Sequence, residues 1–303
     1  MAENKKVLVG GQAVMEGVMM KGPEGISVSV RKVDGSIVSK KDSLPGADKF
    51  YHKMIFFRGV YNLIEMLVIG IKALIWSSNQ LLEDEEDEEE FGTKEIVLLL
   101  IVSFGFALAF FVALPYFLTH IIGIRETSNP IWFNIVDGII KIAIFFLYLV
   151  SISLMQDVKR LFQYHGAEHK SVHCYEHKEE LTVANVKKYT TIHPRCGTSF
   201  IMIVLFISII IFALIPPVID LLFSGFSALG FWAQKGILFP LRIVFIPLIA
   251  GISYEILRLS ARFEKNILLR LMTTPGLWVQ KITTSEPDDQ QIDVAIDALK
   301  KVL

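Results

Sequence analysis

Two stretches of this chain carry no charged side chain over more than twenty residues, and they constrain its fold more than any other feature. They run from Ile96 to Thr119 and from Gly197 to Ile219, which is 24 and 23 residues. About 20 apolar residues in a helix span the hydrocarbon core of a bilayer. Hydrophobic residues make up 52% of the chain and charged residues 20%, which fits the same class. The sequence therefore predicts a mainly α-helical, multi-pass protein of the cell membrane.

Two further segments are long and apolar but contain charges. Ile131–Gln156 carries Asp137 and Lys141, whose spacing of four places them on one helical face, where they can pair. Gly236–Glu255 carries Arg242 and two prolines, a pattern typical of a kinked helix packed against its neighbours. Counting both segments as spans gives four transmembrane helices.

The positive charges predict the orientation of these spans. The connection at 157–196 holds seven Lys and Arg, whereas the two other connections hold one each. Because Lys and Arg concentrate on the cytoplasmic side, this loop is expected there. Nine Lys and Arg before residue 54 place the N-terminus inside as well, and the tail at 259–303 follows. Both termini are then cytoplasmic, which requires an even number of crossings, and a four-span domain at 95–258 satisfies this.

The segment 54–76 passes for a fifth span by hydropathy alone. Arg58, Glu65 and Lys72 recur in it every seven residues and so form a narrow polar stripe on a helix. This pattern favours an amphipathic helix that is interfacial or re-entrant, although packing on the protein's own membrane core and a true crossing both stay open. An acidic linker at 77–94 follows, with eight consecutive acids. Without them the chain is basic, which suits a membrane face and does not imply nucleic acid.

The two ends of the chain are expected to be small cytoplasmic units. Residues 1–53 are predicted to form a β unit, with a hairpin in which Ile26–Val33 alternates and Asp34-Gly35 turns. The glycine-rich segment 10–20 is expected to be a turn packed on the membrane face, in preference to a place at the mouth of a site. The tail predicts a terminal helix that starts near Ser285 and has one apolar face.

The main candidate for chemistry is a ladder of four histidines at four-residue intervals, His165, His169, His173 and His177. On a helix these side chains lie one above another, close enough to share an ion. Glu168 turns the first pair into an H-x-x-E-H motif, in which two histidines bind a metal and the glutamate handles a proton.

A catalytic zinc site needs three protein ligands and one open position, so a third ligand must come from elsewhere. His193 and Cys196 lie in a Pro- and Gly-containing turn where the third span begins, and Glu255 closes the fourth span on the same side of the membrane. The sequence predicts a divalent metal, with zinc as the expected ion. The predicted ligands are His165, His169 and one of Glu255, His193 and Cys196; Glu168 is the predicted catalytic residue; and Glu16, His173, Glu176 and His177 are additional candidates.

Five segments in order resemble one family. They read GGQAVMEGVMM, YHGAEHK, HPRCGTSF, GISYE, and PGLWVQ followed by TTSEPDD. The chain resembles the YqhQ-like family of bacterial integral membrane proteins, a family of unknown function described as predicted metal-dependent enzymes. The resemblance implies an inner-membrane location and a suspected metal site, and its motifs include Glu16, His165, Glu168, His169, His193, Cys196 and Glu255. His173 and His177 lie beyond these motifs, which favours the H-x-x-E-H interpretation over a four-histidine site.

Three functions stay open from the sequence. The first is a metal-dependent hydrolase at the cytoplasmic face, acting on a lipid headgroup, an isoprenoid phosphate or a membrane peptide. The second is a non-enzymatic scaffold or membrane-protein biogenesis factor with a structural metal site and membrane-protein partners. The third is a transporter or channel, suggested by Asp137, Lys141 and Arg242 but not by any evident inverted repeat.

Overall fold

The N-terminal unit is a four-stranded antiparallel sheet with the order β1-β2-β3-β4. The computed structural model describes residues 9–43, 57–82, 92–124, 129–226, 228–263 and 266–303. The predicted hairpin is confirmed, and the glycine-rich segment forms a second hairpin instead of the expected turn. Two residues, Met15 and Glu16, join its strands, and Glu16 adopts a φ of 49°. The strands are β1 (Gly10–Val14), β2 (Gly17–Gly22), β3 (Gly25–Arg31) and β4 (Ile37–Asp42).

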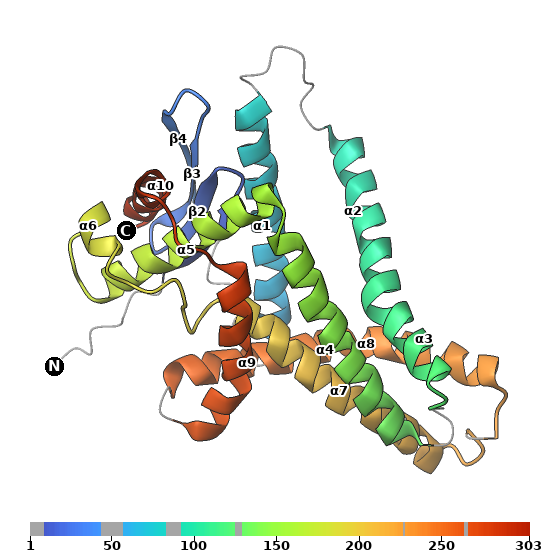
Figure 1. Cartoon of the computed structure of the whole chain (residues 1–303). Helices are drawn as coiled ribbons and strands as arrows, with labels where there is room; N and C mark the ends of the chain where they lie inside the picture. Colours follow the sequence, from blue (N-terminus) through green and yellow to red (C-terminus); the bar gives the residue numbers. More distant parts are fainter. Residues whose placement is uncertain (1–8, 44–56, 83–91, 125–128, 227, 264–265) are drawn as a thin grey trace.

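Helices cover both faces of this sheet (Figure 1). Because strand side chains alternate between faces, Met19 and Val28 pack on α1 (Phe57–Leu82), whereas Val18 and Met20 pack on the other side. That second core also contains residues of α5 (Gln156–Glu176), α6 (Val183–Val186) and α10 (Asp289–Lys300). The N-terminal strands, the histidine helix and the C-terminal helix therefore share one core.

The terminal helix α10 confirms the predicted apolar face. Its residues Ile292, Ala295, Ile296 and Leu299 are all buried. The helix begins three residues later than expected, because Asp288 caps it in a capping box with Gln291.

All four segments predicted as spans are helical. The first runs through α2, a π-helical turn and α3; the second begins where the Asn129 side chain caps the helix ahead of Pro130. The third contains Pro216 and Pro217 and continues three residues beyond Ile219, to Leu222. Their bounds are α2 (Thr93–Leu108), η2 (Ala109–Ala113), α3 (Leu114–Ile121), α4 (Pro130–Ser153), α7 (Gly197–Leu222) and α8 (Phe231–Arg262); α9 (Ile267–Thr283) then leads back to the sheet.

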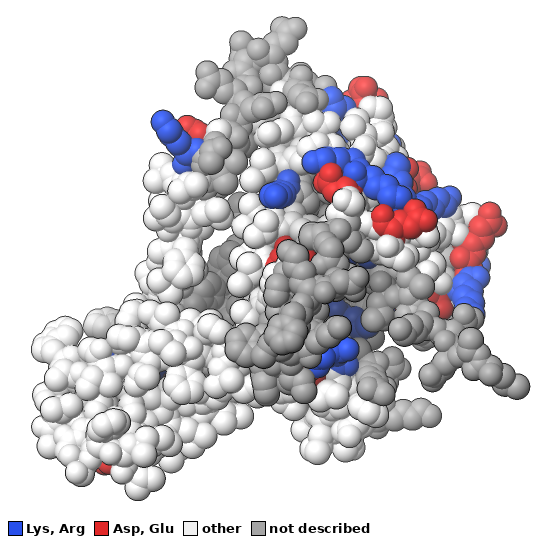
Figure 2. All heavy atoms as spheres, turned by 180° about the vertical axis from the view of Figure 1, so that it is seen from behind, with Lys and Arg blue, Asp and Glu red and all other residues white. Residues whose placement is uncertain are grey.

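Charge is distributed unevenly over these helices. Figure 2 shows Lys, Arg, Asp and Glu gathered over the end that holds the sheet, whereas the surface of the opposite end, formed by the long helices, is almost without charge. By length and composition, five of the described helices could cross a membrane: the four above and α1. Exposed apolar surface on this scale marks a protein of the membrane.

Helix α1 reaches Leu82, six residues further than the predicted segment. Its polar stripe faces the protein in two places, because Glu65 pairs with Lys21 at 2.9 Å and Arg58 forms a two-pronged ion pair with Glu255. Leu63, Ile64, Leu67 and Val68 are exposed on the same helix. The acidic run at 83–90 lies outside the described residues.

Candidate metal centre

The first three histidines of the ladder lie on α5 as predicted, and His177 is its C-terminal cap. The rings of His165 and His169 are 4.4 Å apart between centroids. The small residues between them let the C-terminal segment approach: a Cβ at Gly166 would lie 2.1 Å from the Ser285 carbonyl oxygen. The Ser285 amide also donates to the carbonyl of Phe162. This close approach brings the backbone of residue 283 to the first histidine.

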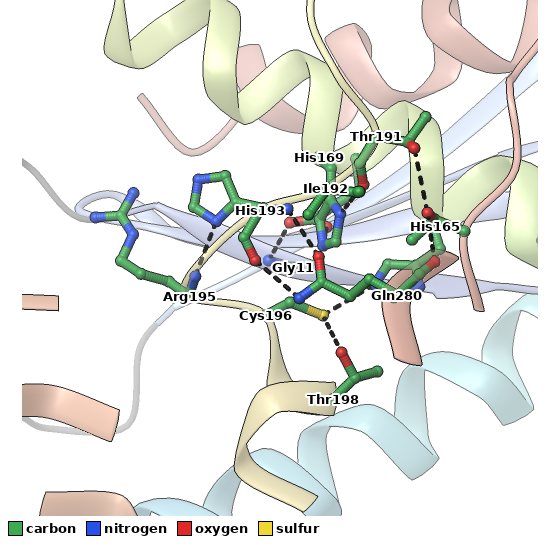
Figure 3. A network of polar contacts seen from close by, with 12 residues as sticks. Gly11, His165, His169, Thr191, Ile192, His193, Arg195, Cys196, Thr198 and Gln280 are labelled. Carbon is green, nitrogen blue, oxygen red and sulfur yellow. Dashed lines mark hydrogen bonds and ion pairs between the residues drawn. The ribbon is translucent and has the colours of Figure 1, made fainter. Parts of the chain in front are cut away.

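The hydrogen bonds of the two histidines fix which ring nitrogen faces the site (Figure 3). Nδ1 of His165 lies 2.8 Å from the carbonyl oxygen of Thr283, and Nδ1 of His169 contacts the carbonyl oxygen of Thr191. A carbonyl oxygen only accepts, so Nδ1 carries the proton in both rings. In a neutral imidazole the lone pair is then on Nε2. Backbone carbonyls orient metal-binding histidines in the same way.

Cys196 completes this group. It is the N-terminal cap of α7, and its Sγ lies 3.3 Å from Nε2 of His165 and accepts a hydrogen bond from the Thr198 hydroxyl. His165, His169 and Cys196 each offer a ligand atom within 4.8 Å of the others. Zinc binds imidazole nitrogen and thiolate sulfur, and its catalytic sites use three protein ligands. The donor set therefore fits the predicted metal, with the third ligand drawn from the predicted alternatives.

Glu168 joins the group to the sheet. Its Oε1 accepts a hydrogen bond of 2.9 Å from the Gly11 amide, and its Oε2 lies 3.4 Å from Nε2 of His169. The carboxylate is buried and faces the same place as the histidine lone pairs. Gly11 belongs to the glycine-rich segment 10–20, for which the sequence favoured a turn on the membrane face over a place at the mouth of a site. The hydrogen bond from its amide to Glu168 agrees with the second of these interpretations.

A buried glutamine that the sequence analysis missed holds the loop before α7. Gln280 Oε1 accepts from the amide of His193, and its Nε2 donates to the His193 carbonyl, at 2.8 and 2.9 Å. The paired bonds fix the turn that carries Cys196. Gln280 is the last residue of the PGLWVQ segment, and the resemblance of that segment to the family is the sequence feature that could have pointed to it.

A second group lies one turn further along α5, made of His173, Glu176 and His193. Burial lowers the pKa of His173 to about 4, so its ring is neutral at physiological pH. Glu176, however, already forms an ion pair with Arg195. The Arg195 guanidinium neutralises the carboxylate that a metal ion would need as a ligand. His173 and Glu176 instead hold the loop at 192–195 against α5, through the Ile192 carbonyl and Arg195.

Three predicted candidates lie outside both groups. The carboxylate of Glu255 is held by Arg58, and that of Glu16 is held by Arg160 and by the hydroxyl of Tyr164. Nδ1 of His177 donates to the carbonyl oxygen of His173, one turn back on its own helix. The structure therefore does not bring Glu255, Glu16 or His177 to the metal ligands.

A cavity of about 1040 Å³ opens beside the three ligands. Its wall includes His165, Glu168, His169 and Cys196, and residues of β1, α1 and the first turn of α7 complete it. The metal position is thus reachable by a ligand of substantial size.

Comparison with known proteins gives the family. The family described as "Protein of unknown function (DUF1385)" matches residues 54–303. The chain belongs to this family. It is also 32% identical over 319 aligned positions to the "Uncharacterized protein YqhQ" of Bacillus subtilis (strain 168), an alignment that covers 97% of this chain and 92% of that protein. No solved structure matches the chain.

Proposed function

We propose that this protein is a metal-dependent hydrolase of the membrane, with zinc as its ion and its site at the cytoplasmic face. One observation carries the proposal. Two imidazoles, each oriented by a backbone carbonyl, turn their Nε2 atoms toward Cys196 and Glu168 on the wall of a large cavity.

The residues divide the chemistry between them. His165, His169 and Cys196 would hold the ion and leave its fourth position open, as catalytic zinc sites do. When bound, such an ion acidifies water and polarises a substrate oxygen. Glu168 is fixed at one oxygen by the Gly11 amide, which leaves Oε2 to take a proton from water and to return it to a leaving group.

The proposed topology has four spans, α2–α3, α4, α7 and α8, with α1 at the cytoplasmic interface. Its support is the packing of α1, whose side chains at Met66, Ile69 and Ala73 lie on the sheet. The sheet belongs with the charged end of the molecule, so much of α1 lies at the level of water and headgroups. Ile64, Leu67 and Val68 are exposed on the same helix and suit shallow insertion into lipid. Both termini are then cytoplasmic.

A structural metal site in a membrane scaffold is the second candidate. The observation in its favour is the position of Glu168, which is close enough to act as a fourth ligand and close the coordination. Substitution of Glu168 separates the two functions because a proton carrier and a ligand respond differently to loss of charge.

The test is Glu168→Gln in the full chain, compared with His169→Ala. A hydrolase predicts that Glu168→Gln keeps its ion but fails to complement a strain lacking the gene, while His169→Ala loses both. Metal content of the purified proteins and growth of the complemented strains are the measurements. Loss of the ion from Glu168→Gln as well as from His169→Ala would show that Glu168 is a ligand and would support the scaffold. Full complementation by Glu168→Gln would contradict hydrolysis.

A further inference from the structure

The β1 edge of the sheet, which carries no further strand among the described residues, forms one wall of the cavity. β1 is an edge strand, and the cavity is lined by the consecutive residues 9–13. Val14 and Gly17 close a two-residue hairpin, so the hydrogen bonds of the ladder fall at every second pair from there. The N–H and C=O groups of Gly11 and Ala13 consequently point away from β2. The bond from the Gly11 amide to Glu168 agrees with this direction.

Helices flank this edge from both faces of the sheet. On one side α5 contributes Glu168 and Val172, and on the other α1 contributes Leu63 and Met66. Residues at the beginning of α7, including Phe200, also line the cavity. The result is a groove that runs along β1, with main-chain groups on one wall and the metal ligands on the next. Its volume lies at the upper end of the ~300–1,000 Å³ typical of small-molecule pockets.

We propose that the substrate is an apolar peptide segment in extended conformation, which binds by adding a strand to β1. This inference rests on the proposed hydrolase function and names its substrate class. The Gly11 amide is taken by Glu168, so β1 offers the N–H of Ala13 and the carbonyl groups of Gly11 and Ala13, an alternation that matches another peptide backbone. Apolar side chains of the peptide would lie against Leu63, Met66 and Phe200.

The charges of the cavity favour a peptide over a phosphate-bearing lipid. Among the described residues that line the cavity, two are cationic, Lys21 and Arg195. Lys21 pairs with Glu65, and Arg195 pairs with Glu176. Each cation is thus balanced by a neighbouring carboxylate, so these two side chains add little net charge to the metal ion to hold a phosphate.

The groove also aligns the reaction. A strand paired with β1 places its peptide bonds beside Glu168, because the same Gly11 amide anchors this carboxylate. Glu168 removes one proton from a water molecule, and the water oxygen forms a bond to the peptide carbonyl carbon. The C–N bond then breaks, and the proton held by Glu168 passes to the departing nitrogen. One peptide and one water give one carboxylic acid and one amine.

Binding of a peptide hydroxamate tests this inference without a known substrate. The probe is trileucine hydroxamate, compared with its backbone N-methylated form, on the zinc-loaded full chain in detergent. Both compounds carry the same metal-binding group, so only main-chain pairing distinguishes them. We expect N-methylation to weaken binding about tenfold, since it removes main-chain hydrogen bonds to β1.

A variant of the strand gives the matching control. Ala13→Pro removes an edge N–H that the sheet does not use, whereas Ala13→Ser keeps it. The proline variant should lose affinity for trileucine hydroxamate by a similar factor and bind acetohydroxamate as wild type does. The serine variant should bind both compounds as wild type does.

Two results would overturn the peptide assignment while leaving the hydrolase intact. The first is equal affinity for the parent and the N-methylated peptide. The second is tighter binding of dodecylphosphonate than of the peptide, which would identify an anionic lipid. Failure of the wild-type protein to retain zinc would instead overturn the proposed function, and the inference with it.

Discussion

Residues of the histidine motif contribute to the site in two ways. His165 and His169 carry ligand atoms, and Gly166 lets the segment at Ser285 approach the helix. His165, Glu168 and His169 could be predicted because their spacing is local and a helix converts it directly into a shared face. Their partners could not, since Gly11, Thr283 and Gln280 reach the site only through tertiary packing.

The misassigned acids show the same limit. Glu16 and Glu255 belong to motifs that resemble the family's, and both carboxylates are half-buried and pair with arginines of other elements. A motif indicates that a carboxylate has a partner, but its sequence does not indicate whether that partner is a metal or a guanidinium.

The packing of Gly166 against the C-terminal segment can be tested by substitution. Gly166→Ala should destabilise the protein by about 1–3 kcal/mol, because its Cβ would overlap the Ser285 carbonyl oxygen. It should also weaken metal binding, since the displaced segment carries the carbonyl that orients His165. Gly105→Ala is the control: no atom lies within 4 Å of its Cβ position, so a helix-favouring alanine should cost nothing. Thermal unfolding in detergent measures the stability of both variants. Equal melting temperatures for Gly166→Ala and Gly105→Ala would contradict the close packing of Gly166 against Ser285.

At the scale of elements, the sheet and α10 depend on each other. The periodic apolar face of α10 and the β3–β4 hairpin were both predictable from side-chain spacing. β1 and β2 were not, because glycine is depleted in strands and its abundance there indicates a turn. At Gly17 the close approach of β3 explains the glycine: a Cβ would lie 2.2 Å from the Ser29 carbonyl oxygen.

Asp297 joins α10 to the sheet and gives a pH-dependent prediction. Burial alone would raise the pKa of Asp297, but hydrogen bonds from Lys301, Ser39 and Ser29 outweigh it and hold the pKa below its ordinary value of 3.8. A lowered carboxyl pKa contributes stability that is complete above pH ~3.8 and is lost as the pH falls through the folded-state pKa. Asp297→Asn should therefore lower the melting temperature at pH 7, and its difference from wild type should shrink toward pH 3.

The control is Asp293→Asn, one turn earlier on an exposed position of the same helix. It should match wild type throughout. A deficit in Asp297→Asn that stayed constant down to pH 3 would show that the lost stability is not electrostatic.

At the scale of the whole molecule, the number of membrane crossings depends on the position of α1. The apolar blocks predicted the other long helices well, since a bilayer demands a continuous run of apolar residues. An amphipathic helix is harder to assign because the sequence does not show what its polar face contacts. Here that face contacts the sheet and α8.

Four spans predict a specific labelling pattern with a membrane-impermeant maleimide. Ile122→Cys, at an exposed turn after α3, should react on intact cells, whereas Val33→Cys, at the exposed β3–β4 turn, should react only after permeabilisation. Both native cysteines are buried and should stay silent. Reaction of Val33→Cys on intact cells would make α1 a fifth crossing.

The central claim is that His165, His169 and Cys196 hold one metal ion, and metal analysis of the purified full chain tests it most directly. Wild type and Cys174→Ser should contain about one zinc per chain, because Cys174 packs in the core away from the site. Cys196→Ser and His165→Ala should lose most of it while remaining folded. A wild-type protein that is folded but free of metal, even after incubation with zinc, would contradict the account.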